Sequence, residues 1–384
     1  MTDHIVVLGA GYAGAGAIRS LQSRLDADAR LTWVSDTDYH LVLHEAHRVI
    51  RDPAVRSDIT IPVDRIADST TAFVEDRVVG LDVEERRVEL ESGEPIEYDY
   101  VLVALGTKTA YYGIPGLEDH ALTLKSLEDA LEIHEAVTQA GSAATRTDPA
   151  QVVIGGAGLS GIQTAGEVAE YRDANRAPIE IHLVEALDEI FPGNDPEIQA
   201  ALRERLEEAG VRIHTDDPIT EAADDRIHFD EGEALEYDVL VWTGGITGRE
   251  ALDGTPLENQ HNRLMAGATF QTSDDRVFAI GDSAVIDQGD QPAPPTAQAA
   301  WQAADVAGEN IHRTLQGRPL RSWEFEDKGT VVSVGEKAVA HDVAYVPFGT
   351  FGGRRAKFLK KFIAARWIAD LTSWNHARTC WSSL

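Results

Sequence analysis

The chain has 384 residues, enough for two or three domains, and its hydrophobic fraction of 43% is ordinary for a folded protein. It carries 34 Lys and Arg against 65 Asp and Glu, which gives a net charge of −31. This balance argues against nucleic acid as a partner, because phosphate binding needs stripes of Lys and Arg. We expect a protein of a halophilic cell, where salt screens the self-repulsion; an acidic protein of an ordinary cell is the alternative.

The single cysteine, Cys380, limits the redox chemistry. It excludes an intrachain disulfide, a cysteine-only zinc site, an iron–sulfur cluster and a Cys-x-x-Cys pair, so electron transfer must use a bound cofactor. No run of 18 apolar residues predicts a membrane-spanning helix. A strand pattern begins by about His4, which leaves no room for a signal peptide.

Strand and helix patterns alternate from the start of the chain, as is typical of α/β layers with parallel sheets. We expect strands at residues 5–8 and 31–34, with a helix from about Ala13 to Arg24 between them. A hairpin pattern covers residues 73–90, and a buried strand then runs from Tyr98 into a glycine at position 106.

A second unit repeats this order. Residues 141–150 are small and polar and predict a linker or loop. A strand at 151–154, a glycine-rich loop, a helix and a strand at 179–185 follow, which is an internal repeat of the βαβ kind. The stretch 238–245 then ends a strand in glycine, as 99–106 does.

A dinucleotide fingerprint, Gly-Ala-Gly-Tyr-Ala-Gly, lies between the first strand and the first helix. Its first glycine permits the tight turn, its second lets the backbone approach a pyrophosphate, and its third allows close packing of helix and strand. The helix N-terminus then offers N–H donors to the phosphates. The predicted contacts are Gly9, Gly11, Tyr12, Ala13 and Gly14.

A ribose-binding acid is expected at the end of the second strand, where Ser35 and Asp36 stand. A hydroxyl can also hold a ribose, so Ser35 remains a candidate. The fingerprint recurs at Gly156, Gly158 and Gly161, and the strand after it ends in Glu185. A carboxylate at that place repels a 2′-phosphate, so NADH is expected over NADPH.

With a late Gly281-Asp282, these motifs resemble the flavoproteins that have two dinucleotide-binding domains. The resemblance implies that the aspartate binds the ribityl chain of FAD. It also implies cofactor contacts at Val78, Ala104, Gly106, Gly244, Gly281, Asp282 and Ala300.

Within that group the chain resembles the type II NADH:quinone dehydrogenases, also called alternative NADH dehydrogenases, and its acidity predicts a haloarchaeal member. The matching stretches are residues 38–40, 112–118, 124–130, 294–302 and 327–330. The resemblance implies FAD and NADH as cofactors, hydride transfer from NADH to FAD, and electron transfer to a membrane quinone without proton pumping. It places Gln298 and Gln302 beside the flavin ring, on the side that faces the quinone and the nicotinamide. Alternatively, the two glutamines could simply cap or line a helix.

Two departures from the family pattern concern the site. The family has Glu in the helix after the second fingerprint, where it is proposed to deliver a proton to quinone, and this chain has Gln163. A glutamine cannot exchange a proton, so Glu167, one helical turn on, is the candidate substitute. Second, His40, His44 and His47 have spacings that place three imidazoles on one helical face. We predict no metal there, because flavin chemistry needs none.

The last 45 residues carry a net charge of +5, so the rest of the chain carries −36. A basic and aromatic tail suits a membrane interface, and the resemblance implies a peripheral protein on the cytoplasmic face; a homodimer contact or packing on the core is the alternative. The expected membrane contacts are Arg354, Arg355, Lys357, Phe358, Lys360, Lys361, Phe362 and Trp367.

We expect two Rossmann-type domains and a small C-terminal region. The predicted bounds are 1–115 with 236–325 for FAD, 116–235 for NADH, and 326–384 for the tail. Two rivals remain: a relative of sulfide:quinone oxidoreductase, which would need redox cysteines, and a flavin-binding sensor with little turnover, which only Gln163 favours.

Overall fold

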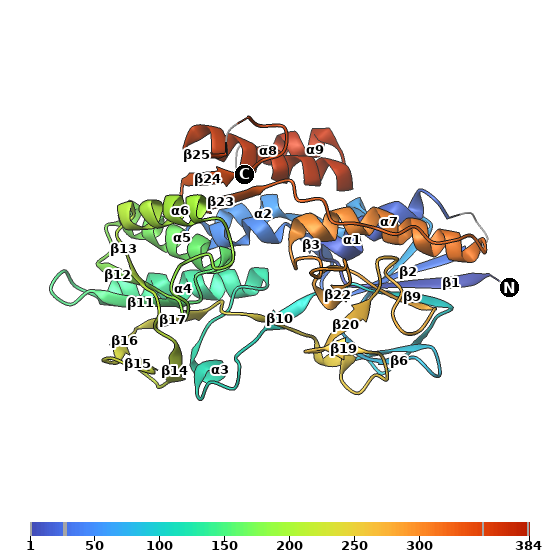
Figure 1. Ribbon diagram of the computed structural model, residues 1–384, viewed down its shortest axis with the longest axis horizontal. Coiled ribbons are helices and arrows are strands. Elements are labelled where there is room, and N and C mark those ends of the chain that lie inside the picture. The colour runs from blue at the N-terminus through green and yellow to red at the C-terminus, as the bar shows by residue number, and fades with distance from the viewer. Residues whose placement is uncertain (1, 26–28, 348, 382–383) are drawn as a thin grey trace.

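Two α/β units lie side by side, and the C-terminal segment lies along one side of both (Figure 1). The computed structural model describes residues 2–25, 29–347, 349–381 and 384. The main sheets have the strand orders β21-β9-β1-β2-β5 and β13-β12-β11-β17, with every pairing parallel. The predicted fold class is confirmed.

The first unit is built on five parallel strands, and all of them except the edge strand at 71–75 are largely buried, as a parallel sheet covered by helices requires. They are β1 (Asp3–Leu8), β2 (Ala29–Ser35), β5 (Thr71–Glu75), β9 (Tyr100–Val103) and β21 (Val277–Ala279). Helix α1 (Tyr12–Gln22) packs on this sheet, and α7 (Ala297–Leu315) packs on α1. The expected hairpin is present as β6 (Val78–Asp82) and β7 (Arg87–Leu90).

The second unit repeats the arrangement. Its strands are β11 (Ala150–Gly155), β12 (Ile179–Val184), β13 (Val211–His214) and β17 (Val239–Trp242), and its helices are α4 (Leu127–Ala143), α5 (Leu159–Asn175) and α6 (Pro196–Glu208). The predicted loop at 141–150 is shorter than expected, because α4 continues to Ala143. Gly141 allows this, since its missing side chain leaves room for Ile179.

Two crossings join the units. They are β10 (Thr107–Thr109) and β18 (Ile246–Gly248), which pair antiparallel. The expected boundary at residue 235 precedes β17, yet β17 pairs with β11 in the second sheet. We therefore propose that the second unit extends from the end of β10 to the start of β18.

The C-terminal region is a three-stranded sheet followed by two helices. The elements are β23 (Thr330–Val334), β24 (Lys337–His341), β25 (Thr350–Gly352), α8 (Arg354–Leu371) and α9 (Trp374–Cys380). One face of α8 is buried, at Ala356, Lys360, Ala364, Trp367, Ile368 and Leu371. Trp367 and Lys360, expected at a membrane, thus lie inside. Among the described helices, none is long and apolar enough to cross a membrane.

Short elements complete the fold. The strands are β3 (Tyr39–Leu41), β4 (Thr60–Pro62), β8 (Ile96–Glu97), β14 (Ile219–Ala222), β15 (Arg226–Phe229), β16 (Leu235–Glu236), β19 (Asn259–Gln260), β20 (Arg263–Ala266) and β22 (Ala284–Ile286). The helical turns are η1 (Leu43–Ile50), η2 (Pro53–Val55), α2 (Arg56–Ile59), η3 (Val63–Arg65), α3 (Leu117–His120), η4 (Glu250–Leu252) and η5 (Gly281–Ser283).

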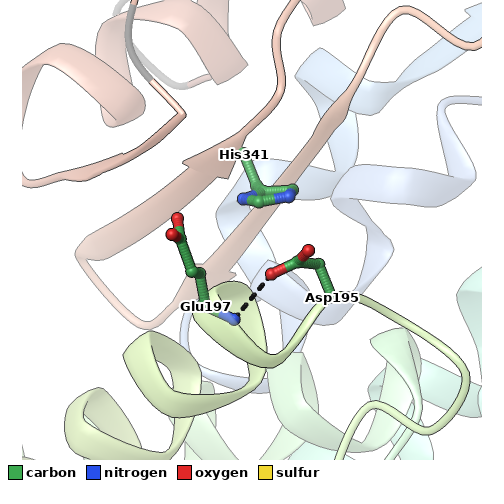
Figure 2. A group of neighbouring side chains, drawn as sticks. All are labelled: Asp195, Glu197 and His341. Atoms are coloured by element: carbon green, nitrogen blue, oxygen red, sulfur yellow. Dashed lines mark hydrogen bonds between the residues drawn. The ribbon is translucent and has the colours of Figure 1, made fainter.

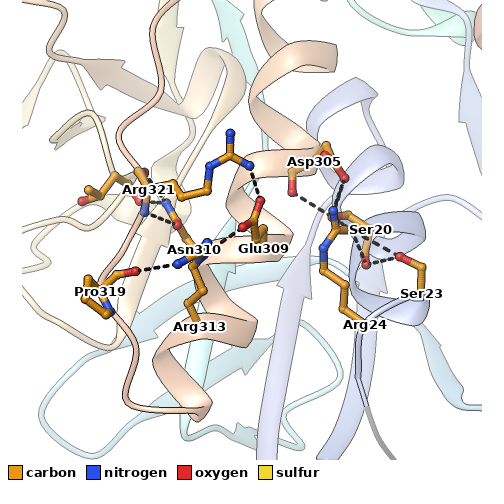
Figure 3. A network of polar contacts seen from close by, with 10 residues as sticks. Ser20, Ser23, Arg24, Asp305, Glu309, Asn310, Arg313, Pro319 and Arg321 are labelled. Atoms are coloured by element: carbon orange, nitrogen blue, oxygen red, sulfur yellow. Dashed lines mark hydrogen bonds and ion pairs between the residues drawn. The ribbon is translucent and has the colours of Figure 1, made fainter.

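Small residues bring α1 and α7 close, and polar side chains hold the rim of this seam (Figure 3). A Cβ on Gly308 would meet Ser20, whose hydroxyl donates to the Asp305 carbonyl over 2.8 Å. On the other side of α7, buried Asn310 donates to the carbonyls of Thr269 (3.0 Å) and Arg321 (2.9 Å) and accepts from the Arg321 N–H (2.8 Å).

We expect Asn310→Ala to lower the free energy of unfolding by roughly 3 kcal/mol, because it leaves three backbone groups without their partner. The control is Asp305→Ala on the same helix, whose side chain is 65% exposed, and which should cost less than about 1 kcal/mol. Urea unfolding in concentrated salt measures both. Equal losses would contradict this account of the seam.

Candidate functional site

Helices α1 and α5 begin without a side-chain cap. Their N-cap residues are Gly11 and Gly158, and neither helix has an acidic residue in its first turn. Helix α8 also begins at an uncapped glycine, Gly353, but it follows an antiparallel strand. The helices α4, α6, α7 and α9, in contrast, are capped by Ser126, Asp195, Thr296 and Ser373. The first-turn N–H groups of α1 and α5 are therefore open to an anion, and the helix dipole favours one.

The glycines of the two fingerprints divide into two kinds. A Cβ on Gly14 would meet the carbonyl of Gly9, and a Cβ on Gly161 would meet the carbonyl of Gly156. The fold itself thus forbids a side chain there. A Cβ on Gly11 or on Gly158 would meet nothing within 4 Å. The middle glycines face open space at the helix start, which fits a phosphate of a dinucleotide.

The segments expected around FAD converge at the first helix start. A Cβ on Gly281 would lie 2.8 Å from the Ala13 Cβ and 3.7 Å from the Ala300 Cβ. The Gly106 N–H donates to the Ser283 hydroxyl over 2.8 Å. The segments that contain Ala13, Gly106, Gly281 and Ala300 therefore meet at the start of α1.

Asp282 stands at this place, in η5. Burial raises the pKa of its carboxyl, while Lys125 and Arg263 oppose the rise. Of the other expected contacts, Ser35 and Val78 are buried at the strand ends. Asp36 is exposed, with Arg77 at 3.9 Å.

The second fingerprint has its own partners. A Cβ on Gly156 would lie 2.7 Å from the Cα of Gly244, as a Cβ on Gly9 would meet Ala104. Glu185, at the end of β12, accepts from the Ala157 N–H (2.8 Å) and the Leu187 N–H (3.1 Å). The carboxylate is thereby held beside the fingerprint, where a ribose would lie.

Gln298 and Gln302, on the first two turns of α7, bind backbone. Gln298 accepts from the Lys328 N–H (2.7 Å) and donates to the Gly329 carbonyl (3.2 Å). Gln302 donates to the Glu326 carbonyl (2.8 Å) and accepts from its N–H (3.1 Å). Both amides thus fasten α7 to the segment before β23, and their role toward substrates stays a prediction.

Gln163 and Glu167 lie in a buried cluster between α5, η1, β23 and α8. We call it the junction cluster; its members are Glu45, His47, Gln163, Glu167, Ser333 and Lys360. The Ser333 hydroxyl accepts from Lys360 (2.6 Å) and from the Gln163 amide (3.2 Å), and it lies 2.9 Å from His47 Nε2.

The charges of the junction cluster are strongly perturbed. Burial raises the pKa of Glu167 to about 7, although Arg51 and Lys360 oppose it. Burial lowers the pKa of Lys360. For Glu45, Lys360 and His44 outweigh the effect of burial, so its pKa is lowered. A cavity of 30 Å³ lies against this cluster, enough for water.

Sequence reasoning missed Glu45, Ser333 and the interior place of Lys360. A signal existed for Lys360: it shares the helical face of Ala356, Ala364 and Trp367, spaced by three and four. Its charge favoured a surface interpretation, which is wrong because Glu45 and Glu167 compensate it inside.

The expectation that His40, His44 and His47 share one helical face is wrong. His40 lies on strand β3, and the other two lie on the 3-10 helix η1. His40 bonds to the Ala10 carbonyl, His44 to the Tyr12 hydroxyl, and His47 to Ser333. The imidazoles therefore point to separate partners.

Among the described residues, one His and carboxylate group has its ligand atoms within 4.8 Å of one another: Asp195, Glu197 and His341 (Figure 2). It lies at the start of α6 beside β24. Both carboxylates are exposed, and Asp195 already caps the helix by accepting from the Glu197 N–H over 2.7 Å. Capping explains this aspartate without a metal.

Comparisons with known proteins agree with this geometry. The model of the pyridine nucleotide-disulphide oxidoreductase family matches residues 3–304. The type II NADH:quinone oxidoreductase of Staphylococcus saprophyticus is 29% identical over 96% of this chain and 95% of its own. That of Staphylococcus aureus is 28% identical over 94% of both chains.

Two solved structures share the fold. NDH2 of Plasmodium falciparum, in complex with NADH, matches with a TM-score of 0.85 and 17% identity over 100% of this chain and 97% of its own. The sulfide:quinone oxidoreductase of Aquifex aeolicus matches with a TM-score of 0.81 and 18% identity over 97% and 92%.

The raised pKa of Glu167 predicts a pH dependence of stability. Its usual value is 4.5 and its folded value about 7, so between these values the folded state binds more protons than the unfolded state. The contribution of Glu167 to the free energy of unfolding then falls as pH rises through this window, by about 3 kcal/mol. His40 and His44 act in the opposite direction, because burial lowers the pKa of each to about 4. The difference in the free energy of unfolding between the unchanged protein and Glu167→Gln isolates the contribution of Glu167 and should fall as pH rises in urea titrations at pH 4.5 to 7.5. Glu94→Gln, at an exposed glutamate, is the control; two parallel curves would contradict the assignment.

Proposed function

The chain belongs to the pyridine nucleotide-disulphide oxidoreductase family, and from that premise we propose that it is an FAD-dependent NADH:quinone oxidoreductase of type II, which does not pump protons. The observation that carries the proposal is the pair of uncapped helix starts in which a glycine turn leads directly from a parallel strand, β1 or β11, into the helix. One lies beside Asp282 and the other beside Glu185, as two different dinucleotides require.

The residues around the start of α1 would hold FAD. The N–H groups after Gly11 would bind the pyrophosphate, Ser35 would bind a ribose hydroxyl, and Asp282 would bind the ribityl chain. FAD, when bound, accepts a hydride from NADH and passes two electrons to the quinone. The chain supplies position and electrostatics.

The residues around the start of α5 would hold NADH. The N–H groups after Gly158 would bind its pyrophosphate, and Glu185 would accept hydrogen bonds from its adenosine ribose. Because NADH brings two electrons but one proton, forming a quinol takes a second proton from solution.

Glu167 is our candidate for handling that proton. Gln163 cannot exchange one, whereas a carboxyl with a pKa of about 7 holds and releases a proton near neutral pH. Lys360 and His47 lie between it and Glu45, and the cavity beside them gives water access. We propose that Gln298 and Gln302 act by fixing the segment before β23, which leads to Ser333.

The rival function is oxidation of sulfide, as the name of the Aquifex aeolicus neighbour states for that protein. It would need a pair of redox cysteines. This chain has only Cys380, buried in α9, and burial raises the pKa of its thiol. A thiol with a raised pKa is a weaker nucleophile at neutral pH, so NADH remains the better donor.

A spectrum of the purified protein under nitrogen tests the proposed function. We expect a flavin spectrum that NADH bleaches and that a soluble quinone restores, and FAD after release by heat. FMN or no flavin would overturn the cofactor assignment. Bleaching that quinone does not reverse would favour the sensor.

Glu185 should determine the preference for NADH over NADPH. NADH should exceed NADPH in kcat/KM, and Glu185→Ser should narrow the ratio by roughly tenfold or more, because it removes the repulsion of a 2′-phosphate. Glu180→Ser, at a half-buried glutamate of the same strand that pairs with Arg212, is the control and should leave the ratio unchanged. Equal kcat/KM values in the unchanged protein would refute the assignment.

We further propose that the outer face of α8 and α9 docks on the cytoplasmic face of the membrane in concentrated salt. The exposed aromatic residues are Phe358, Phe362 and Trp374, since Trp367 is buried. In molar salt the exposed cations should contribute little, although each would add about 1 kcal/mol at low salt.

Liposome sedimentation in molar salt compares two variants. One changes Phe358, Phe362 and Trp374 to Ser, and the other changes Arg354, Arg355 and Arg378 to Gln. The first should release the protein from liposomes and the second should not. The reverse result would show that docking is electrostatic, and a change of oligomeric state in the first variant would instead favour a dimer contact.

A further inference from the structure

Trp367 joins helix α8 to the first fingerprint. Its indole is buried, and its ring centroid lies 4.8 Å from that of Tyr12 and 4.7 Å from that of Trp301. A Cβ on Gly16 would lie 3.4 Å from the edge of the indole. Tyr12 and Gly16 are one turn apart on α1, so the indole lies across the first turns of that helix.

A chain of two hydrogen bonds continues from the indole to the backbone of the fingerprint. Trp367 Nε1 donates to His40 Nε2 over 2.8 Å, and His40 Nδ1 donates to the Ala10 carbonyl over 2.7 Å. The indole N–H only donates and the carbonyl only accepts, so the two ends fix a neutral His40 with its proton on Nδ1. Burial lowers the pKa of His40 to about 4, which keeps the ring in that form.

The Ala10 carbonyl belongs to the same planar peptide unit as the Gly11 N–H. Holding the carbonyl therefore fixes the direction of that N–H, on the residue that faces open space at the start of α1. Tyr12, on the other side of Gly11, is held by the indole and by a hydrogen bond to His44. Both neighbours of Gly11 are thus positioned by side chains outside the fingerprint.

We propose that Trp367 is a positioning residue. It couples the packing of the inner face of α8 against α1 to FAD binding, through His40 and the Ala10–Gly11 peptide. The inference rests on the proposed function in that the bound dinucleotide is FAD. Coupling of two such equilibria is reciprocal, so FAD should also strengthen the packing of α8 against α1 by the same factor.

Trp367→Phe tests the coupling, because it keeps an aromatic ring against Tyr12 and removes the N–H. Trp323→Phe is the matched control: Trp323 is also buried, packs on Phe270 with ring centroids 5.4 Å apart, and has no contact with His40 among the described residues. Titration of the deflavinated full chain with FAD should show roughly tenfold weaker binding for the first variant and little change for the second.

Limited trypsin digestion gives the reciprocal readout. FAD should slow cleavage after Lys361 and Arg366 in the unchanged protein, and Trp367→Phe should reduce this protection while far-UV circular dichroism stays unchanged. His40→Asn should weaken FAD binding similarly. The double variant should lose no more than the larger single loss, because both act through one chain of hydrogen bonds.

The outcomes separate the coupling from the proposed function. Equal loss of FAD affinity in Trp367→Phe and Trp323→Phe, or additive losses in the double variant, would overturn the coupling while FAD still binds. Protection from trypsin that FAD does not change would also overturn it. A protein that binds no FAD would overturn the proposed function itself.

Discussion

The packing of each fingerprint helix against the glycine turn before it governs the rest of the structure. Gly14 and Gly161 lie so close to the carbonyls of Gly9 and Gly156 that no Cβ fits. This contact places both helix starts at the carboxyl ends of their sheets, with the first-turn N–H groups facing outward. Everything else at the two sites, including the strand-to-glycine endings and η5, is arranged around these two starts.

The buried charges of the protein are balanced, whereas those of its surface are mostly negative. The surface is strongly acidic, yet burial of two carboxylates, Glu45 and Glu167, is balanced by cations from η1 and α8. Three of the seven lysines of the chain, Lys357, Lys360 and Lys361, lie on α8 near this place. Salt screens exposed charges but acts little on buried ones. The perturbed pKa values of the junction cluster should therefore depend less on salt concentration than those of exposed groups.

The sequence predicted what depends on local spacing. Strand and helix order and both fingerprints follow from short motifs, because a glycine turn admits few backbone paths. The convergence of Ala13, Gly281 and Ala300 was implied by the family resemblance and not by spacing. Features that depend on long-range pairing were not predictable. The membership of β17 in the second sheet is one example, since a buried strand looks alike in either sheet.

The three histidines of residues 40–47 show the other limit of sequence reasoning. Their spacing fits a helix, but a strand ends at Leu41 and a 3-10 helix begins at Leu43, so the periodicity of 3.6 residues does not apply. The partner of each imidazole comes from a segment far away in the sequence: Ala10, Tyr12 and Ser333. Spacing alone contains no information on such partners.

The two faces of helix α8 explain why the amphipathic pattern of the tail is imperfect. A membrane-surface helix places its aromatic residues on one face and its cations on the other. In α8, Phe358 and Phe362 point outward while Lys360 and Trp367 point inward, because the inner face serves Glu45, Glu167 and His40. The sequence of α8 therefore meets two requirements: an outer face for the proposed membrane docking and an inner face for packing on the rest of the protein. Loss of the whole tail would remove the outer face together with the cover of α1, so only changes confined to one face can separate membrane docking from cofactor binding.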